Sequence, residues 1–200
     1  MGAPPDCKLC PLSHYRTHVV NGRIVGTTNQ PPLLIVGESP GAAEDAQGKP
    51  FVGPTGAFLA QELKARGITD YALTNAMRCF PGENKKESEM AAGVVACNPY
   101  LLEDIDEIAP KVILALGVYA VRALGFNDPM ATILCHTLQG PKDTTVVVSY
   151  HPAFFFREPG GLHLFDLAVL KVRLLLDGIP YGREWPPQLL TLEEFKKCVM

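Results

Sequence analysis

The chain has 200 residues, of which 47% are hydrophobic and 20% charged, which is enough for one substantial core and a little short for two independent domains. No apolar run approaches the roughly 20 residues that a membrane-spanning helix needs, and the first residues lack a secretory signal, so we expect a soluble, cytoplasmic protein with no membrane partner. The net charge of -3 at pH 7 excludes a generally cationic surface, so a polyanionic partner would have to bind a local basic patch.

Along the chain, short apolar runs alternate with helical patterns. The runs predict buried strands at residues 33–36, 71–74, 112–116 and 145–148. Apolar residues at helical spacing, most of them followed by a glycine or proline, predict helices at 56–66, 87–108, 117–124 and 162–177. Before the first strand, the Asn21-Gly22 pair within residues 19–25 predicts a small hairpin appendage.

This alternation of strands and helices predicts an α/β fold. Parallel strands joined by helical crossovers form a sheet that helices cover on both faces. We therefore expect a single domain over residues 1–200, a three-layer αβα structure with a central four-stranded parallel sheet. Residues 1–30 precede the sheet as an N-terminal arm that carries two cysteines.

Polar residues and glycines follow the predicted strands. Gly37, Glu38 and Ser39 come directly after the first strand, Asn75 after the second, and His151 shortly after the fourth. Ligands of open parallel sheets bind in the crevice beyond the carboxyl ends of the strands. The sequence therefore predicts that these loops converge on one pocket.

The loop at residues 37–41 suits close approach to a ligand, because its glycines have no side chains to obstruct backbone N–H groups. Its spacing matches neither GxGxxG nor GxxxxGK[ST], which disfavours a dinucleotide or Walker-type phosphate site. We expect Glu38 at the pocket floor, with Glu44 and Asp45 on the following turn. The alternative for Glu44 and Asp45 is a solvated pair that caps a helix.

Two residues have both a functional and a structural interpretation, and a third is the best histidine candidate. Phe51, on a rigid loop, either offers a flat face for stacking a base or belongs to the core. Asn75 either reads the edge of a pyrimidine with its amide or closes a turn. His151, which precedes a proline that restricts its backbone, is the best functional candidate among five histidines.

The chain contains six cysteines, which in an intracellular protein indicate metal or redox chemistry more often than disulfides. Cys7 and Cys10 form a CxxC pair, and Cys79 and Cys97 can complete a set of four thiolates. Four thiolates suit a tetrahedral zinc ion or a [4Fe–4S] cluster, and their spacing alone does not distinguish the two. The alternative is a small buried hydrophobic residue, to which we assign the remaining two cysteines.

Assembled in chain order, these motifs resemble one known family: the iron–sulfur branch, often called family 4, of the uracil-DNA glycosylase superfamily. The similarity extends from about residue 7 to residue 157, and the loop motif, the cysteines and the His-Pro motif support it independently. The motifs that carry it are Gly37-Glu38-Ser39-Pro40-Gly41, Glu44-Asp45, Gly48-Lys49-Pro50-Phe51-Val52-Gly53, Thr74-Asn75, Cys7, Cys10, Cys79, Cys97 and His151-Pro152-Ala153.

The resemblance implies a uracil-DNA glycosylase-like fold and hydrolysis of the N-glycosidic bond of uracil in DNA by base flipping, the step that begins base excision repair. It implies that Phe51 stacks on the flipped base, that Asn75 binds its polar edge, and that His151 lies near the carbonyl that gains charge. It also implies that the first loop lines the side of the pocket that holds the deoxyribose, and that Glu38 or Glu44 orients the water that attacks this sugar. The implied residues of this loop and its turn are Gly37, Glu38, Ser39, Gly41 and Glu44.

The resemblance further implies a [4Fe–4S] cluster on Cys7, Cys10, Cys79 and Cys97 that serves structure more than redox catalysis. The expected partner is uracil-containing DNA, single- or double-stranded, and the protein is expected to act as a monomer. Its expected location is the cytoplasm of a prokaryote, or a viral nucleoid.

Basic residues in or beside the motif loops are expected to face DNA: Lys49, Arg78, Lys85, Lys86 and Arg157. Relatives place a wedge into the duplex after the His-Pro motif, where this chain has Phe154, Phe155 and Phe156, and we take Phe155 as the candidate. A buried core turn is the alternative for at least two of the three. Residues 80–86 lack the arginine and paired prolines expected of the family, which predicts a difference in DNA binding or in base preference.

Two other functions are weighed against uracil excision. One is a glycosylase of the same superfamily that acts on another deaminated or modified base. The other is a non-catalytic iron–sulfur DNA-binding module, against which the joint presence of Glu38, Asn75 and His151 argues.

Overall fold

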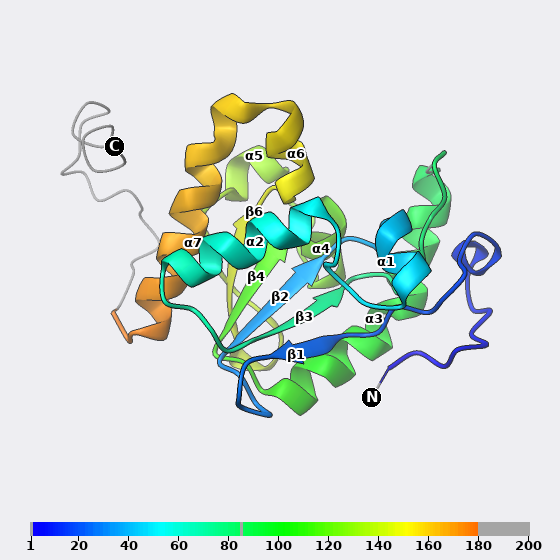
Figure 1. The fold of residues 1–200 in the computed structure, drawn as a ribbon, viewed down its shortest axis with the longest axis horizontal. Helices are drawn as coiled ribbons and strands as arrows, with labels where there is room; N and C mark the ends of the chain where they lie inside the picture. The colour runs from blue at the N-terminus through cyan, green and yellow to red at the C-terminus, as the bar shows by residue number, and fades with distance from the viewer. Residues whose placement is uncertain (1, 85, 180–200) are drawn as a thin grey trace.

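A computed structural model describes residues 2–84 and 86–179 of the chain. These residues pack around a six-stranded sheet whose strands lie in the order β1-β3-β2-β4-β6-β5 (Figure 1). The strands are β1 (Arg23–Val25), β2 (Leu33–Gly37), β3 (Tyr71–Asn75), β4 (Val112–Leu116), β5 (Thr137–Gln139) and β6 (Thr145–Ser149).

The four predicted strands form the centre of this sheet. β3, β2, β4 and β6 pair in parallel, with β2 between β3 and β4. The sheet is larger than the four parallel strands predicted, because β1 and β5 add antiparallel to β3 and β6 at the two edges. Each edge strand has three residues and none of them is buried, so neither strand produces an apolar run in the sequence.

Helices connect the strands and cover the sheet. They are α1 (Ala42–Gln47), α2 (Pro54–Ala65), α3 (Glu87–Ile108), α4 (Val118–Ala123), α5 (Met130–Ile133), α6 (Pro152–Arg157) and α7 (Leu162–Leu176), with 3-10 helices at Pro11–His14, Pro141–Asp143 and Pro159–Gly161. The four predicted helices are α2, α3, α4 and α7, each found within two residues of its predicted ends. In the described part of the chain, no helix combines the length and the apolar character that crossing a membrane requires.

Alternate side chains of each central strand enter two separate cores. On β2, Leu34 and Val36 pack with α3 and α4, whereas Leu33 and Ile35 pack with α2, α6 and α7. Helices therefore cover both faces of the sheet (Figure 1). Burial on both faces explains why the central strands read as continuous apolar runs rather than as alternating ones.

The predicted hairpin at residues 19–25 is wrong. The Asn21 side chain instead exchanges two hydrogen bonds with the backbone of Ala3, donating at 3.0 Å and accepting at 2.9 Å. β1 pairs with β3 rather than with a strand across an Asn-Gly turn. The arm is thus anchored along the edge of the main sheet and is not a separate appendage.

Candidate active site

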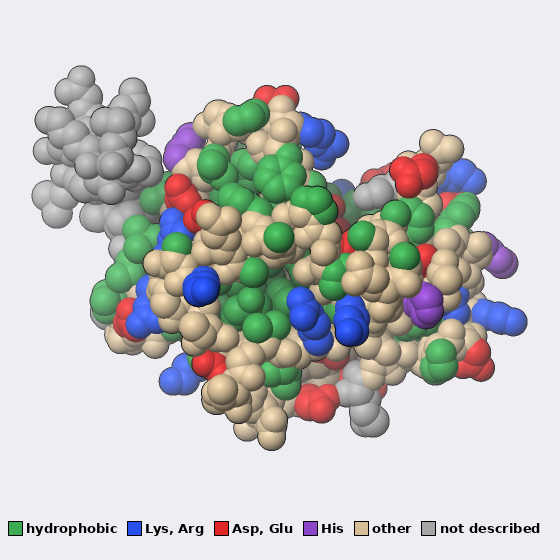
Figure 2. Space-filling view, in the orientation of Figure 1, with side chains coloured by type: hydrophobic (Ala, Val, Ile, Leu, Met, Phe, Trp, Pro, Cys, Tyr) green, Lys and Arg blue, Asp and Glu red, His purple; other side chains and the backbone are tan. Residues whose placement is uncertain are grey.

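A pocket of about 430 Å³ lies beyond the carboxyl ends of the parallel strands. Residues from the loops after β2, β3, β4 and β6 line it, among them Glu38, Asn75, Gly117 and His151. The space-filling view shows the surface hollowed between α1 and α6, the helices that follow two of these loops (Figure 2). The loops that the sequence predicted to converge therefore do meet in one pocket.

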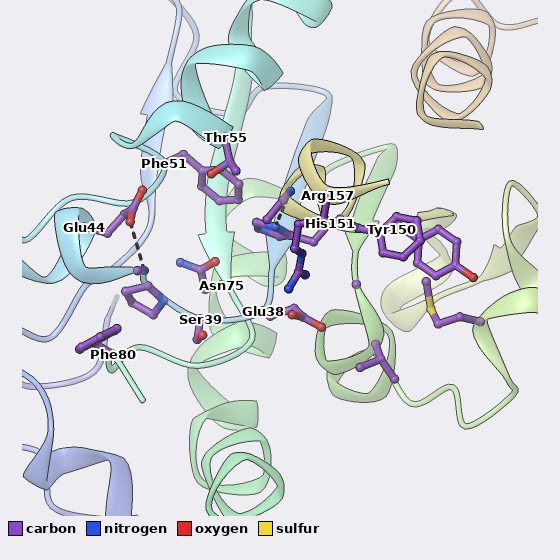
Figure 3. A pocket seen from close by; sticks show the side chains of 17 residues that line it. Glu38, Ser39, Glu44, Phe51, Thr55, Asn75, Phe80, Tyr150, His151 and Arg157 are labelled. Atoms are coloured by element: carbon purple, nitrogen blue, oxygen red, sulfur yellow. Dashed lines mark hydrogen bonds between the residues drawn. The ribbon is translucent and has the colours of Figure 1, made fainter. Parts of the chain in front are cut away.

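The side chains of Phe51, Asn75 and His151 point toward the same space in this pocket, and the Glu38 carboxylate lies beside it (Figure 3). Ser39 and Gly41 also line the pocket. One nucleotide placed here would therefore be within reach of residues that are far apart in sequence.

Gly37, the last residue of β2, allows Asn75 and Phe51 to approach each other. A Cβ at this position would overlap the Asn75 Oδ1 atom and would lie 2.8 Å from the Phe51 Cζ atom. Gly37 itself is buried, so its part in the site is to leave this space empty. Any larger residue here would separate the aromatic ring from the amide.

The amide of Asn75 opens onto the pocket. Asn75 is 3% exposed, at the end of β3 and in register with Gly37. Among the described residues, none forms a hydrogen bond with its side chain, and the amide atoms are not fully buried, so they are accessible from the pocket. An unpaired amide that lines a pocket is the arrangement expected of a group that binds a polar ligand.

Phe51 belongs both to the core and to the pocket. It is 8% exposed and packs in the same core as α2 and α7, yet its ring lines the pocket. Its φ angle of 54° lies in the left-handed region, which non-glycine residues rarely adopt. A Cβ on Gly56 would overlap the Phe51 carbonyl, so the start of α2 packs directly on this backbone. The two interpretations of Phe51 are therefore compatible.

Glu44 lies in a different environment from the solvated pair considered above. It is 9% exposed, and its carboxylate accepts the backbone N–H groups of Gly41 at 3.1 Å, Val52 at 3.1 Å and Gly53 at 2.9 Å. These bonds join the loop after β2 to the loop that carries Phe51. Glu44 lines the pocket as well, but most of its acceptor capacity serves this connection.

Asp45 is buried too, and it holds the N-terminal arm. Its carboxylate accepts the N–H of Thr17 at 2.8 Å and that of His18 at 3.0 Å. The Nδ1 atom of His18 lies 2.6 Å from the Asp45 carbonyl oxygen. Neither residue of the Glu44-Asp45 pair is solvated, so that part of the alternative is wrong, but Glu44 does cap α1 by accepting the N–H of its N-cap residue Gly41.

The imidazole of His151 is oriented by the helix that follows it. His151 is the N-cap of α6, and its Nδ1 atom accepts the backbone N–H of Ala153 at 3.3 Å (Figure 3). Because Nδ1 accepts this bond, the proton of the neutral ring is on Nε2. His151 can therefore present an N–H donor to a ligand.

The residues predicted to contact DNA after the His-Pro motif differ in exposure. Phe155 is 3% exposed and its ring centroid lies 5.8 Å from that of Phe165, so the prediction that Phe155 enters the duplex is wrong for this conformation. Phe156 is 52% exposed, and Arg157 is exposed and lines the pocket. Lys85 lies outside the described residues.

Arg78 was predicted on the DNA face, and this is wrong because it is 0% exposed. Its Nη2 atom pairs with Asp104 Oδ2 at 2.6 Å and donates to the Tyr100 carbonyl at 3.3 Å, while Nη1 donates to the Thr74 hydroxyl. Its Nε atom has no hydrogen-bond partner among the described residues. Burial raises the pKa of the Cys97 thiol, and a backbone hydrogen bond from Arg78 and the Arg78 charge oppose this rise, so the buried cation lies beside the cysteines.

The exposed lysines of the predicted basic patch are Lys49 and Lys86. Lys86 pairs with Glu89 at 3.3 Å, at the beginning of α3. The patch is therefore smaller than predicted in the described part of the chain.

The four cysteines of the predicted cluster lie close enough to influence one another. Cys79 and Cys97 are buried, and Cys7 and Cys10 are half-buried. Burial raises the pKa of the Cys79 thiol to about 12, and the other three cysteines add to this rise while Arg16 opposes it. Within the described residues, no three His, Cys, Asp or Glu side chains are close enough together to hold a single metal ion.

The sequence analysis missed several residues that line the pocket, including Thr55, Phe80, Met130 and Tyr150. The Tyr150 ring stacks on Phe154, with ring centroids 4.5 Å apart. Tyr150 directly precedes His151, so its place after β6 could have identified it. Met130 is on the short helix α5, for which the sequence has no comparable signal.

Comparison with known proteins identifies the family. The profile of the Uracil DNA glycosylase superfamily matches residues 25–172. A Type-4 uracil-DNA glycosylase of Pyrobaculum aerophilum is 33% identical over 176 residues, covering 82% of this chain and 87% of the relative. The Type-4 uracil-DNA glycosylase of Saccharolobus solfataricus is 33% identical, and the match covers 87% of this chain and 83% of the relative. That of Thermotoga maritima is 34% identical, and the match covers 76% of this chain and 78% of the relative. This chain belongs to the uracil-DNA glycosylase superfamily.

Proposed function

We propose that this protein is a uracil-DNA glycosylase, which hydrolyses the N-glycosidic bond of a uracil nucleotide flipped out of DNA. The observation that carries the proposal is the convergence of Glu38, Phe51, Asn75 and His151 on one pocket. The relatives named above, all Type-4 uracil-DNA glycosylases, support it.

Two residues bind the base. Phe51 supplies a flat face on which the extruded uracil stacks, at a fixed distance from Asn75 because Gly37 leaves room for both. The Asn75 amide accepts from the N3–H group of uracil and donates to its O4 atom. Cytosine presents an acceptor and a donor at these two positions, so the same amide in the same orientation rejects it.

His151 stabilises the charge that develops on the base. As the bond between C1′ and N1 breaks, its electrons pass to the base, and the Nε2–H group of His151 donates to the uracil O2 atom. By analogy with single donors of oxyanion holes, such a bond contributes about 3 kcal/mol. The hydrogen bond from Ala153 to Nδ1 fixes the ring in the required tautomer.

Glu38 orients the water that attacks the sugar. The water oxygen bonds to C1′ and its proton passes to the carboxylate, while uracil leaves as the anion and is protonated afterwards. The carboxylate also stabilises the positive charge of the sugar as it develops. Glu44 is the weaker candidate for this task, because three backbone N–H groups already occupy its carboxylate.

The DNA backbone and the gap left by the flipped base are bound beside the pocket. Phe156 is the exposed aromatic residue of α6, and it is next to Arg157, which lines the pocket. In the space-filling view hydrophobic side chains gather over α6, beside the hollow (Figure 2). We assign the wedge to Phe156 and a phosphate contact to Arg157.

The same proposal includes a [4Fe–4S] cluster on Cys7, Cys10, Cys79 and Cys97. A single zinc ion needs four sulfur atoms within about 4 Å of one another, whereas in a cluster each thiolate binds a separate iron. The described cysteines lie close enough to act on the Cys79 thiol together, which supports one group held by all four, and the resemblance to the iron–sulfur branch favours the cluster over zinc. The nearby charges of Arg16 and Arg78 suit an anionic group. When bound, the cluster would cross-link the N-terminal arm to α3 and to the segment after β3.

The activity is tested by measuring uracil release from single- and double-stranded oligonucleotides that contain one uracil, with thymine and cytosine oligonucleotides alongside. We expect Asn75→Ala and His151→Ala to lower the single-turnover rate by about 100-fold or more. His136→Ala is the matched control, because His136 is exposed and does not line the pocket. Failure of the wild-type protein to release uracil from either substrate contradicts the proposal.

The cluster is tested on freshly purified protein. We expect broad visible absorbance, and iron and acid-labile sulfide in equal amounts, which zinc does not give. Cys79→Ser should lose both, whereas Cys135→Ser should keep them because Cys135 hydrogen-bonds to the Leu164 carbonyl, far in sequence from the other cysteines. Stoichiometric zinc without iron would overturn this part of the proposal.

A further inference from the structure

We propose that Gly117 is a positioning residue for Glu38. The absence of a side chain at Gly117 lets the Glu38 carboxylate lie against the start of α4, in the orientation that the reaction needs. This inference rests on the proposed role of Glu38 in orienting water.

The space beside Gly117 is filled by Glu38. A Cβ at Gly117 would lie 2.6 Å from both the Cδ and the Oε1 atoms of Glu38, and 2.8 Å from its Cγ atom. Gly117 follows β4 directly, and its N–H donates to the Ser149 carbonyl at 2.9 Å, which fixes it between the ends of β4 and β6. The backbone that carries any substituted side chain is therefore held in place.

Both ends of Glu38 are held by neighbouring loops. Its carbonyl oxygen accepts the N–H of Met77 at 3.0 Å, which joins it to the segment after Asn75. Its Oε1 atom accepts the N–H of Tyr119 at 3.2 Å, in the first turn of α4. The carboxylate thus reaches the Tyr119 N–H only by passing through the space that Gly117 leaves open.

An alanine at Gly117 should displace the Glu38 carboxylate without unfolding the protein. The atoms that a new Cβ would meet belong to the end of a flexible side chain, so rotation of Glu38 relieves the overlap at little cost. Rotation also breaks the bond from Tyr119 and moves the carboxylate away from its position beside the pocket (Figure 3). A misplacement of about 1 Å in an active site can lower the rate about 100-fold.

A second glycine provides a matched control. Gly125 follows the other end of α4, and its φ angle of 93° nearly equals the 95° of Gly117. A Cβ on Gly125 would meet nothing within 4 Å. Alanine at either position therefore strains the backbone, more so at Gly117, where φ 95° and ψ 169° are nearly restricted to glycine, but only at Gly117 does the new Cβ contact Glu38.

The experiment compares Gly117→Ala, Gly125→Ala, Glu38→Gln and the double variant Gly117→Ala/Glu38→Gln. Rates of uracil release at saturating enzyme, KM and unfolding midpoints are measured for each. We expect Gly117→Ala to lower kcat about 100-fold with little change in KM, and Gly125→Ala to keep the wild-type kcat. Gly117→Ala should have the lower unfolding midpoint of the two, because its backbone conformation is nearly restricted to glycine, so all rates are compared below both midpoints. The double variant should be no slower than Glu38→Gln, because both changes act on one group.

Two results would overturn the inference. They are a kcat for Gly117→Ala equal to that of Gly125→Ala, and rate losses that multiply in the double variant. If Glu38→Gln alone keeps the wild-type rate, the proposed role of Glu38 is what fails, and the two failures are thereby distinguished.

Discussion

Replacing Asn75 with leucine should make the protein less active without making it less stable. The Asn75 amide has no partner among the described residues and opens onto the pocket, so its removal breaks no hydrogen bond within the protein. Leucine has a similar shape and no polar atoms, so the free energy of unfolding should change by less than about 1 kcal/mol, which is a change in Tm of less than about 4 °C. Loss of two hydrogen bonds to the base, together about 3 kcal/mol, should lower the rate of uracil release about 100-fold.

Stability is measured by urea unfolding and activity by single-turnover release of uracil. Asn98→Leu is the control, because the Asn98 amide donates to the Ala123 carbonyl at 2.6 Å. Removing a paired amide should lower stability by about 1 kcal/mol and leave the rate unchanged. The reasoning is refuted if Asn75→Leu is less stable than the wild type, because the amide would then have a partner in the free protein.

Three other predictions concern separate features. Arg78→Met leaves the Asp104 carboxylate without its ion-pair partner and should lower the free energy of unfolding by about 3–5 kcal/mol, as measured by thermal unfolding. If the broken ion pair is the cause, the double variant Arg78→Met/Asp104→Leu should regain the lost stability. Arg157→Ala should reduce the slope of the logarithm of the DNA-binding constant against the logarithm of the salt concentration by the amount expected for about one phosphate contact. Fluorescence titrations measure this slope, and an unchanged slope would exclude the contact. Burial raises the pKa of the Cys135 thiol from 9.0 to about 11. The contribution of the protonated thiol to the free energy of unfolding is therefore complete below pH 9 and is lost as the pH rises from 9 to 11. Urea unfolding should show the wild type losing about 2 kcal/mol more than Cys135→Ala over this interval, and parallel pH profiles would contradict it.

The centre of the fold and the location of the pocket follow from local sequence patterns. β2 and β4 are buried on both faces, so each appears as an uninterrupted apolar run whatever its partners are. Once parallel strands are inferred, their carboxyl ends must lie along one edge of the sheet, which brings Glu38, Asn75 and His151 together. Neither step needs knowledge of long-range contacts.

The features that were predicted wrongly depend on contacts between distant residues. The sequence shows Arg78 as a basic residue near a motif, but its burial depends on Asp104, on another element and 26 residues away. The run of three phenylalanines has no periodicity that separates Phe155, which faces Phe165, from the exposed Phe156. Strand β1 is missed because three mostly exposed residues gain strand geometry only by pairing with β3.

The hydrogen bonds of the N-terminal arm bear on how the protein would respond to loss of the cluster proposed above. Asn21 is tied to Ala3, the Val20 N–H donates to the Arg78 carbonyl at 2.8 Å, and Asp45 binds the backbone at residues 17 and 18. None of these contacts involves a cysteine. Loss of the proposed cluster would therefore leave the arm attached through these contacts and through Leu12, which is 1% exposed in the core beside α3, so the walls of the base pocket would keep their support.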